Sequence, residues 1–123
     1  MKLGKVVAGG AMMGPAVENL SYPTTKTTSG LIMLSAAAAE PPQVNPCIRC
    51  GRCVEYCPMG LEPVEVNQAY AARDVQELGK LHVDYCFNCG SCTFVCPAKR
   101  PCTQMMGLAK AFYLGEIKKG GNK

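Results

Sequence analysis

Apolar residues in the first third of the chain occur in short runs. In residues 1–35, the runs Val6–Val7 and Leu31–Leu34 are separated by segments rich in glycine and threonine, a pattern that favours small strands joined by turns. Two such runs are too few to close a sheet by themselves. Residues 36–45 are rich in alanine and proline and are expected to form an extended linker.

A first helix is predicted from Pro63 to Leu78. Proline suits the first turn of a helix, Glu62 and Glu65 favour its N-terminus, and Gly79 suits its far end. Apolar side chains recur at helical spacing along it, and this stripe is expected to pack onto the cysteine-rich loops on either side. The stripe comprises Val64, Ala71, Val75 and Leu78.

A second helix is predicted from about Thr103 to Lys118. Lys118 and Lys119 suit its C-terminal end, where cations interact favourably with the helix dipole. Its apolar positions recur at the spacing of one helix face. They are Met106, Ala109, Phe112 or Tyr113, and Leu114 or Ile117.

The cysteines carry the chemistry of this chain. Eight of the nine form two copies of the motif C-x-x-C-x-x-C-x-x-x-C-P, at Cys47–Pro58 and Cys86–Pro97. Disulfides do not suit this pattern, because the count is odd and cysteines so close on one loop would need strained geometry. A zinc site needs only four ligands and would leave two cysteines of each pattern unexplained. The spacing instead indicates two [4Fe–4S] clusters.

Each motif places three cysteines and the glycine after the second, Gly51 or Gly90, on one loop, so that backbone can approach a cluster. In two-cluster ferredoxins of this spacing, the fourth cysteine ligates the other cluster. We therefore assign one cluster to Cys47, Cys50, Cys53 and Cys96, and the second to Cys86, Cys89, Cys92 and Cys57. Cys102 is left over, and it is expected to be a small buried residue more often than a ligand.

Composition changes this picture only in part. Free cysteines in metal-binding patterns indicate a reducing compartment, hence the cytoplasm, and no apolar run reaches the length of a membrane span. The formal net charge of +4 would be balanced by two clusters, which add about −4 when held by thiolates. Arg49 and Arg52 are candidates for that compensation, and solvated side chains are an equal alternative.

The remaining motifs are weak. His82, the only histidine, is expected to be a surface or packing residue rather than a proton-coupled one. The run Gly9–Gly14 lacks the strand–helix context of a dinucleotide fingerprint, so tight turns explain it adequately. No nucleophile–base pair, phosphate loop or pair of carboxylates indicates a catalytic site, and no basic stripe with aromatic residues indicates nucleic acid.

The sequence resembles the C-terminal part of the RnfC (RsxC) family, the C subunits of Rnf-type electron transport complexes. The segments that carry the resemblance are Gly9–Gly14, Lys26–Ile32, Pro46–Leu61 and Cys89–Gln104. The resemblance implies a small α+β fold. Residues 1–35 would be the tail of a β-grasp ligand-binding domain, residues 36–45 a linker, and residues 46–119 an α-helical ferredoxin-like domain with two [4Fe–4S] clusters.

The resemblance also implies a function. The chain would carry electrons as part of an ion-translocating NADH–ferredoxin oxidoreductase, with no catalytic site of its own. FMN and NADH would bind only in an upstream domain or a partner that this chain does not contain. Its partners would be that flavin-bearing domain or subunit, the membrane-bound Rnf redox subunits and ferredoxin. It would lie peripherally at the cytoplasmic side of the membrane, without a transmembrane segment.

Two alternatives remain at this point. The chain could carry electrons in a soluble oxidoreductase of heterodisulfide-reductase or glycolate-oxidase type. It could also be a protein of a different class, such as a nucleic-acid enzyme, whose clusters are structural. Two closely linked clusters favour electron transfer over a structural role.

Overall fold

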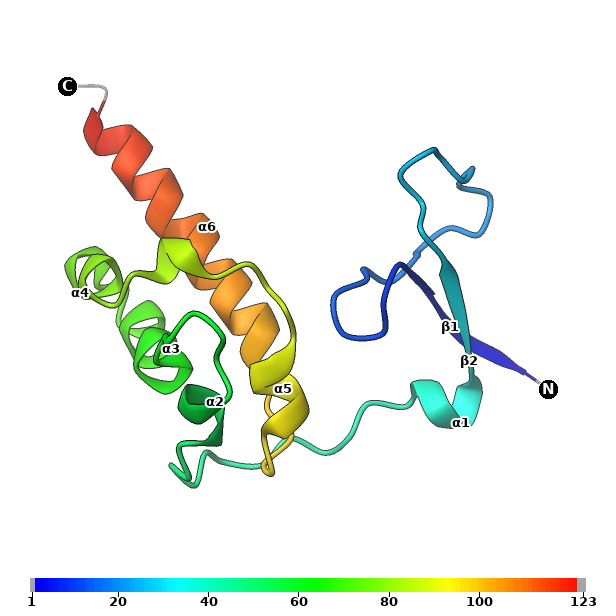
Figure 1. Ribbon diagram of the computed structural model, residues 1–123, viewed down its shortest axis with the longest axis horizontal. Helices are drawn as coiled ribbons and strands as arrows, with labels where there is room; N and C mark the ends of the chain where they lie inside the picture. The colour runs from blue at the N-terminus through cyan, green and yellow to red at the C-terminus, as the bar shows by residue number, and fades with distance from the viewer. Residues whose placement is uncertain (1, 122–123) are drawn as a thin grey trace. The chain divides into compact units, whose positions relative to one another are not determined.

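The computed structural model describes residues 2–121, and the chain divides into two compact units between Gln43 and Val44. The first unit contains a two-stranded sheet, and the described part of the second contains helices only (Figure 1). The coarse prediction of a small fold with helices and a little β-structure is therefore confirmed.

Strands β1 (Leu3–Ala8) and β2 (Leu31–Ser35) pair antiparallel, as the two apolar runs predict. Val6 and Val7 are buried on this sheet. The sheet of the described residues has two strands, so the assignment to a β-grasp domain stays a prediction.

The expected extended linker is wrong at its start, because residues 36–39 form the short helix α1 (Ala36–Ala39). The hydroxyl of Ser35 caps this helix by accepting a hydrogen bond from the backbone N–H of Ala38 at 3.3 Å. Alanine has the highest intrinsic helix propensity, so four alanines after a capping serine favour one helical turn.

The second unit is built from five helices and one 3₁₀ turn in its described residues. They are α2 (Arg52–Glu55), α3 (Pro63–Ala71), α4 (Val75–Lys80), η1 (Val83–Tyr85), α5 (Ser91–Val95) and α6 (Cys102–Gly121). The helices α3 and α6 lie side by side (Figure 1). Together with α4, η1 and the residue Leu61 before α3, they form a core of Leu61, Val66, Ala69, Leu78, Val83, Met106 and Ala109.

The first predicted helix is wrong as a single element, because it breaks into α3 and α4. At the break Arg73 adopts a left-handed backbone with φ 57°, and its guanidinium lies 4.6 Å from the ring centroid of Tyr70 and 5.1 Å from that of Phe112. The stripe expected along one continuous helix is therefore interrupted. Leu78 is fully buried, whereas α3 buries Pro63, Val66 and Ala69 instead of Val64 and Ala71.

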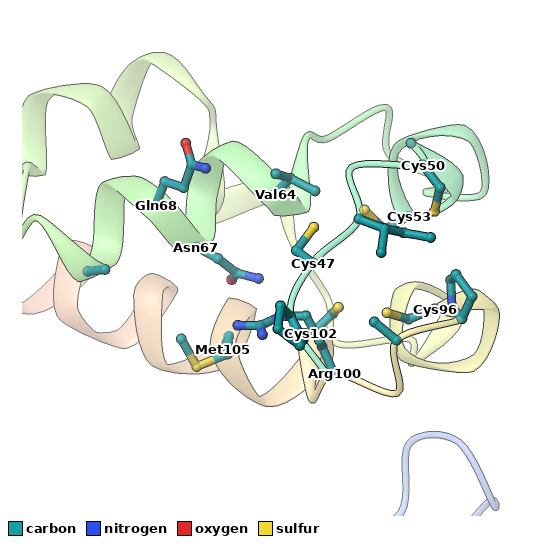
Figure 2. A pocket seen from close by; sticks show the side chains of 16 residues that line it. Cys47, Cys50, Cys53, Val64, Asn67, Gln68, Cys96, Arg100, Cys102 and Met105 are labelled. Carbon is teal, nitrogen blue, oxygen red and sulfur yellow. The ribbon is translucent and has the colours of Figure 1, made fainter. Parts of the chain in front are cut away.

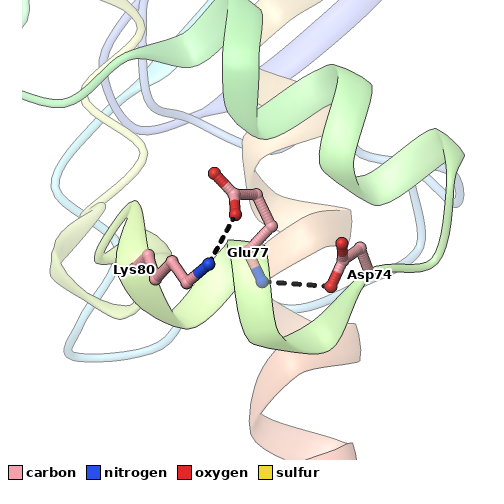
Figure 3. Close-up of polar contacts among 3 residues, drawn as sticks. All are labelled: Asp74, Glu77 and Lys80. Atoms are coloured by element: carbon pink, nitrogen blue, oxygen red, sulfur yellow. Dashed lines mark hydrogen bonds and ion pairs between the residues drawn. The ribbon is translucent and has the colours of Figure 1, made fainter.

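Helix α4 begins at its own cap. The carboxylate of Asp74 accepts a hydrogen bond from the backbone N–H of Glu77 at 3.1 Å, and Lys80 pairs with the Glu77 carboxylate at 3.3 Å (Figure 3). An acidic cap followed three residues later by glutamate is a known start signal for a helix, so the sequence contained the information for this break.

Gly79 does not end a helix as predicted, but lies inside α4. A Cβ at this position would lie 3.2 Å from the hydroxyl oxygen of Tyr113 and 3.3 Å from an edge carbon of its ring. Glycine therefore allows the close approach of α4 to Tyr113 on α6, since a Cβ here would require the tyrosine ring to shift by a few tenths of an ångström. The helix ends at Lys80, and its C-cap residue Leu81 is followed by left-handed His82.

The second predicted helix is confirmed, and it extends from Cys102 to Gly121. Met106 and Ala109 are buried in the core, and Phe112 and Tyr113 pack against it. Leu114 and Ile117 remain 39% and 46% exposed, so the apolar stripe contributes to the core only in the first half of the helix.

The internal repeat extends beyond the cysteines into the backbone of the second unit. When the two copies are aligned on Cys47 and Cys86, three pairs of equivalent residues have a left-handed backbone in both copies. They are Arg49 and Asn88, Gly51 and Gly90, and Gly60 and Lys99. At the same offset α2 corresponds to α5, and the first residue of α3, Pro63, corresponds to the first residue of α6, Cys102. Each half is thus a cysteine loop, a short helix, a turn and a longer helix.

In the part of the chain that the structure describes, no helix has the length and apolarity needed to cross a bilayer.

We expect Asp74→Ala to loosen α4, because the N–H of Glu77 loses its acceptor. The cap contributes about 1 kcal/mol, so amide hydrogens of α4 should exchange about fivefold faster. The matched control is Asp74→Asn, since the asparagine side chain also caps helices and should leave the exchange rates near those of the unchanged protein. Equal protection of α4 in the alanine variant would contradict a stabilising cap.

Candidate metal centre

The cysteines of the second unit fall into two groups, each around its own cavity. The first cavity, of about 340 Å³, is lined by four of the predicted ligands: Cys47, Cys50, Cys53 and Cys96. Figure 2 shows these cysteines around the opening, with Val64, Asn67 and Gln68 of α3 on one side and Cys102 and Met105 of α6 on another. Three of the four cysteines come from the first motif and one from the second.

The second cavity has the reciprocal composition. It is lined by Cys57 of the first motif and by three cysteines of the second, namely Cys86, Cys89 and Cys92. Its volume is about 20 Å³, which holds about one water molecule.

Both cavities present thiols, the ligands that iron–sulfur clusters use. Among residues 2–121, no group of three or more histidine, cysteine, aspartate or glutamate side chains converges on a single metal-ion position. A cubane does not need such a point, because each of its four irons takes a different cysteine. The four motif cysteines of each cavity are therefore a donor set that fits a [4Fe–4S] cluster.

Local backbone geometry directs the thiols into the cavities. Gly51 and Gly90, with φ 77° and 86°, stand before α2 and α5, and this left-handed conformation is easiest for glycine. Each turn points the following helix so that its cysteine, Cys53 or Cys92, faces inward, and Cys53 is only 8% exposed. Cys47 and Cys50 are exposed at the rim.

Backbone amides donate to several of the sulfurs. The N–H of Arg49 donates to Cys47 Sγ and that of Leu61 donates to Cys57 Sγ, both at 3.4 Å. Such hydrogen bonds stabilise negative charge on a thiolate, which is the state that binds iron.

The pKa values of the buried thiols follow from their surroundings. Burial raises the pKa of Cys53 and of Cys92. Burial also acts on Cys96, but hydrogen bonds from the backbone of Arg100 and Ala98 and from the Cys102 thiol outweigh it and lower the pKa of Cys96. Burial and the neighbouring charge of Cys96 raise the pKa of Cys102 to about 12.

Cys102 is buried as predicted, with 6% of its surface exposed. Its position was not predicted, because it lines the first cavity and its thiol hydrogen-bonds to Cys96. Asn67 lies on the same cavity, and its buried Oδ1 has no hydrogen-bond partner among the described residues.

Thr103 is another residue that sequence reasoning missed as part of a site. Its hydroxyl lies 3.5 Å from Cys92 Sγ in the second cavity. The structure extends the repeat to all three residues, because their counterparts also line the cavities: Pro63 for Cys102, Val64 for Thr103 and Met106 for Asn67.

Other candidate residues have simpler roles. Arg49 forms an exposed ion pair with Glu65 at 3.7 Å, and Arg52 is exposed at the start of α2. His82 is exposed and stacks on Tyr85 with ring centroids 5.2 Å apart, which confirms its prediction as a surface or packing residue.

Comparison with known protein families supports a cluster domain. Residues 46–99 match the family model of the 4Fe-4S dicluster domain. The expectation that this part of the chain is a ferredoxin-type domain with 4Fe–4S clusters is therefore confirmed.

Curated relatives are, by name, components of ion-translocating complexes. The C subunit of the ion-translocating oxidoreductase complex of Rhodobacter capsulatus is 42% identical over 77 residues, which is 63% of this chain and 15% of the relative. The C subunit of the proton-translocating ferredoxin:NAD(+) oxidoreductase complex of Clostridium ljungdahlii is 44% identical over 59 residues, or 48% of this chain and 13% of the relative.

A third relative has a similar match. The C subunit of the Na(+)-translocating ferredoxin:NAD(+) oxidoreductase complex of Acetobacterium woodii is 38% identical over 72 residues, or 58% of this chain and 16% of the relative. The chain thus matches only 13–16% of the length of these three relatives. The resemblance to part of an Rnf-type C subunit is confirmed.

We propose that the two cavities are the two cluster sites, and we expect ligand substitutions to act across the motifs. Cys57→Ala should perturb the cluster held by Cys86, Cys89 and Cys92, because all four line one cavity. Cys96→Ala should perturb the cluster of Cys47, Cys50 and Cys53 for the same reason. Cluster-resolved EPR spectra of the reduced variants measure this. Disturbance of the cluster of the substituted cysteine's own motif would contradict crossed ligation.

We expect Cys102→Ala to retain about eight irons per chain, the content of two cubanes, because four other cysteines line its cavity. Iron analysis of the reconstituted variant measures the content. The matched control is Cys53→Ala, which removes a predicted ligand of the same cavity and should lower it. An equal loss of iron in both variants would make Cys102 a ligand.

Proposed function

We propose that this chain, which contains a 4Fe-4S dicluster domain and is similar to part of the C subunits of ion-translocating oxidoreductase complexes, carries single electrons through two [4Fe–4S] clusters in such a complex. The observation that carries the proposal is the division of eight cysteines into two cavities of four, each completed by the other motif. This arrangement supports crossed ligation of two neighbouring clusters.

Short stretches of chain would connect the two clusters. Cys53 lines the first cavity and Cys57 the second, with only Val54, Glu55 and Tyr56 between them. The same relation holds in the second motif, where Cys92 lines the second cavity and Cys96 the first. Two clusters held at such a spacing would be close to each other, which suits electron transfer better than a structural role.

In the proposed electron transfer, the protein holds the cluster ligands in place and gives them hydrogen-bond donors. When bound, each cluster accepts one electron at a time. The buried thiols and the donated backbone hydrogen bonds hold the ligands in place and stabilise negative charge on the sulfurs. Oxidation of a nicotinamide removes a hydride, which needs a two-electron acceptor such as a flavin. We propose that this flavin, FMN, and the NADH site lie in an upstream domain or a separate partner protein.

We also propose which proteins exchange electrons with this chain and where in the cell it lies. Electrons would arrive from the flavin-bearing domain and leave toward membrane-bound redox subunits of an Rnf-type complex, or pass to or from ferredoxin. The chain would lie at the cytoplasmic face of the membrane, held there by these partners. The names of the curated relatives support such a complex.

The alternative of a soluble oxidoreductase of heterodisulfide-reductase or glycolate-oxidase type is not favoured. The curated relatives cited above, from three different organisms, are all C subunits of ion-translocating complexes by name. The cysteine motifs alone would not separate these classes, because many cluster proteins share them.

We expect dithionite, a one-electron donor, to bleach the visible absorbance of the reconstituted chain under anaerobic conditions, and NADH alone to leave it unchanged. Single cubanes cannot accept a hydride. Addition of NADH together with a flavoprotein that oxidises it provides the positive control. Rapid bleaching by NADH without a flavoprotein would contradict the proposal that the chain is a carrier only.

A further inference from the structure

The two cluster cavities differ at one pair of equivalent positions. Val64 is the second residue of α3 and lines the first cavity, whereas Thr103 is the second residue of α6 and lines the second. Each lines the same cavity as the third cysteine of a motif, Cys53 or Cys92. Val64 and Cys53 line the first cavity together, and in the second cavity the Thr103 hydroxyl lies 3.5 Å from Cys92 Sγ. The repeat therefore offers a hydroxyl to one cluster and a methyl group to the other.

A second threonine fixes the Thr103 side chain. Thr93, on α5, accepts a hydrogen bond from the backbone N–H of Thr103 at 2.8 Å. The Thr93 hydroxyl in turn donates to Thr103 Oγ1 at 2.7 Å. All three groups are partly buried, so the arrangement is held within the protein and not by solvent.

These contacts determine where the proton of the Thr103 hydroxyl goes. Because Thr103 Oγ1 already accepts the proton of Thr93, its own proton is free to be donated. Cys92 Sγ lies within hydrogen-bonding distance, and a thiolate bound to iron can only accept. Thr103 thus becomes the donor to Cys92 once a cluster is present.

We infer that the Thr103 hydroxyl is a positioning and tuning group for the second cluster: it donates a hydrogen bond to the Cys92 ligand and raises the reduction potential of that cluster, while Val64 gives the first cluster no such hydroxyl. The inference rests on the proposed function, in which Cys92 is a ligand. One-electron reduction adds negative charge to the cluster and its thiolates, so a donated hydrogen bond stabilises the reduced state more than the oxidised state.

Thr103 acts on the potential of its own cluster, and other groups near the ligands also contribute to the two potentials. Motif loops add other groups at equivalent positions: Asn88 and Ser91 contact Cys86 and Cys89 in the second motif, where the first has Arg49 and Arg52. Thr103 differs from these because it lies on α6, outside the motif, and can be replaced without altering the loop.

The experiment is a potentiometric EPR titration of the full chain with both clusters reconstituted, comparing Thr103→Val, Thr103→Ser and Val64→Thr with the unchanged protein. Thr103→Val should lower the equilibrium constant for reduction of one cluster about tenfold, which is about 59 mV for one electron. The affected cluster should be the one that Cys57→Ala perturbs. Thr103→Ser keeps the hydroxyl and should restore the potential. Val64→Thr should raise the potential of the other cluster.

The fold should survive the valine substitution, because the backbone N–H of Thr103 still donates to Thr93. If Thr103→Val loses iron, Thr103→Ala takes its place, since alanine also lacks the hydroxyl and favours a helix. In the unchanged protein, pulsed ENDOR of the reduced second cluster should detect a proton near the Cys92 sulfur that exchanges in D₂O and that Thr103→Ala removes.

The outcomes separate this inference from the proposed function. Fewer than about eight irons in the unchanged chain would count against the two-cluster function itself. Eight irons with unchanged potentials in Thr103→Val or Thr103→Ala would overturn the role of Thr103. Equal shifts at both clusters, or no recovery in Thr103→Ser, would indicate a general structural effect and also overturn it. If Val64→Thr leaves both reduction potentials unchanged, the proposal that Val64 and Thr103 make the two sites differ would be overturned.

Discussion

The structure of the second unit is governed by one constraint: each of its two cavities is lined by four motif thiols, but each cysteine loop supplies only three of them. The fourth thiol of each set comes from the end of the other motif, as Cys96 does for the first cavity and Cys57 for the second. Both loops must therefore lie together before either set is complete. In this arrangement cluster binding and folding would be linked, because iron ligation would cross-link parts of the chain that are distant in sequence.

Helix packing provides the frame for that arrangement. The helices α3 and α6 share a core around Val66, Leu78 and Met106, and their first turns line the cavities. The apolar core thus fixes the positions of the loops that precede both helices. Left-handed residues at equivalent places, Gly51 and Gly90, then turn the short helices so that Cys53 and Cys92 face inward.

The two cavities are similar because the second unit contains two copies of one repeat. They differ because the copies have different residues at some equivalent positions. Proline at the start of α3 corresponds to Cys102 at the start of α6, and Val64 corresponds to Thr103. The first site consequently has a fifth thiol, which hydrogen-bonds to Cys96, and the second has a hydroxyl near Cys92. Because hydrogen bonds to cluster ligands change reduction potentials, such differences can distinguish two clusters of the same chemical type.

The sequence alone determined the chemistry, because the cysteine spacing is a local property that can be recognised without any knowledge of the fold. It also predicted β1 and β2 from their short apolar runs and α6 from apolar positions at helical spacing. The break between α3 and α4 was missed although Asp74 and Glu77 carry a capping signal, and Gly79 was interpreted as a helix end although it contacts Tyr113. Only the tertiary structure decided that Cys102, Asn67 and Thr103 line the cavities. Their positions depend on how α3 and α6 pack, and packing between distant segments leaves no local pattern in the sequence.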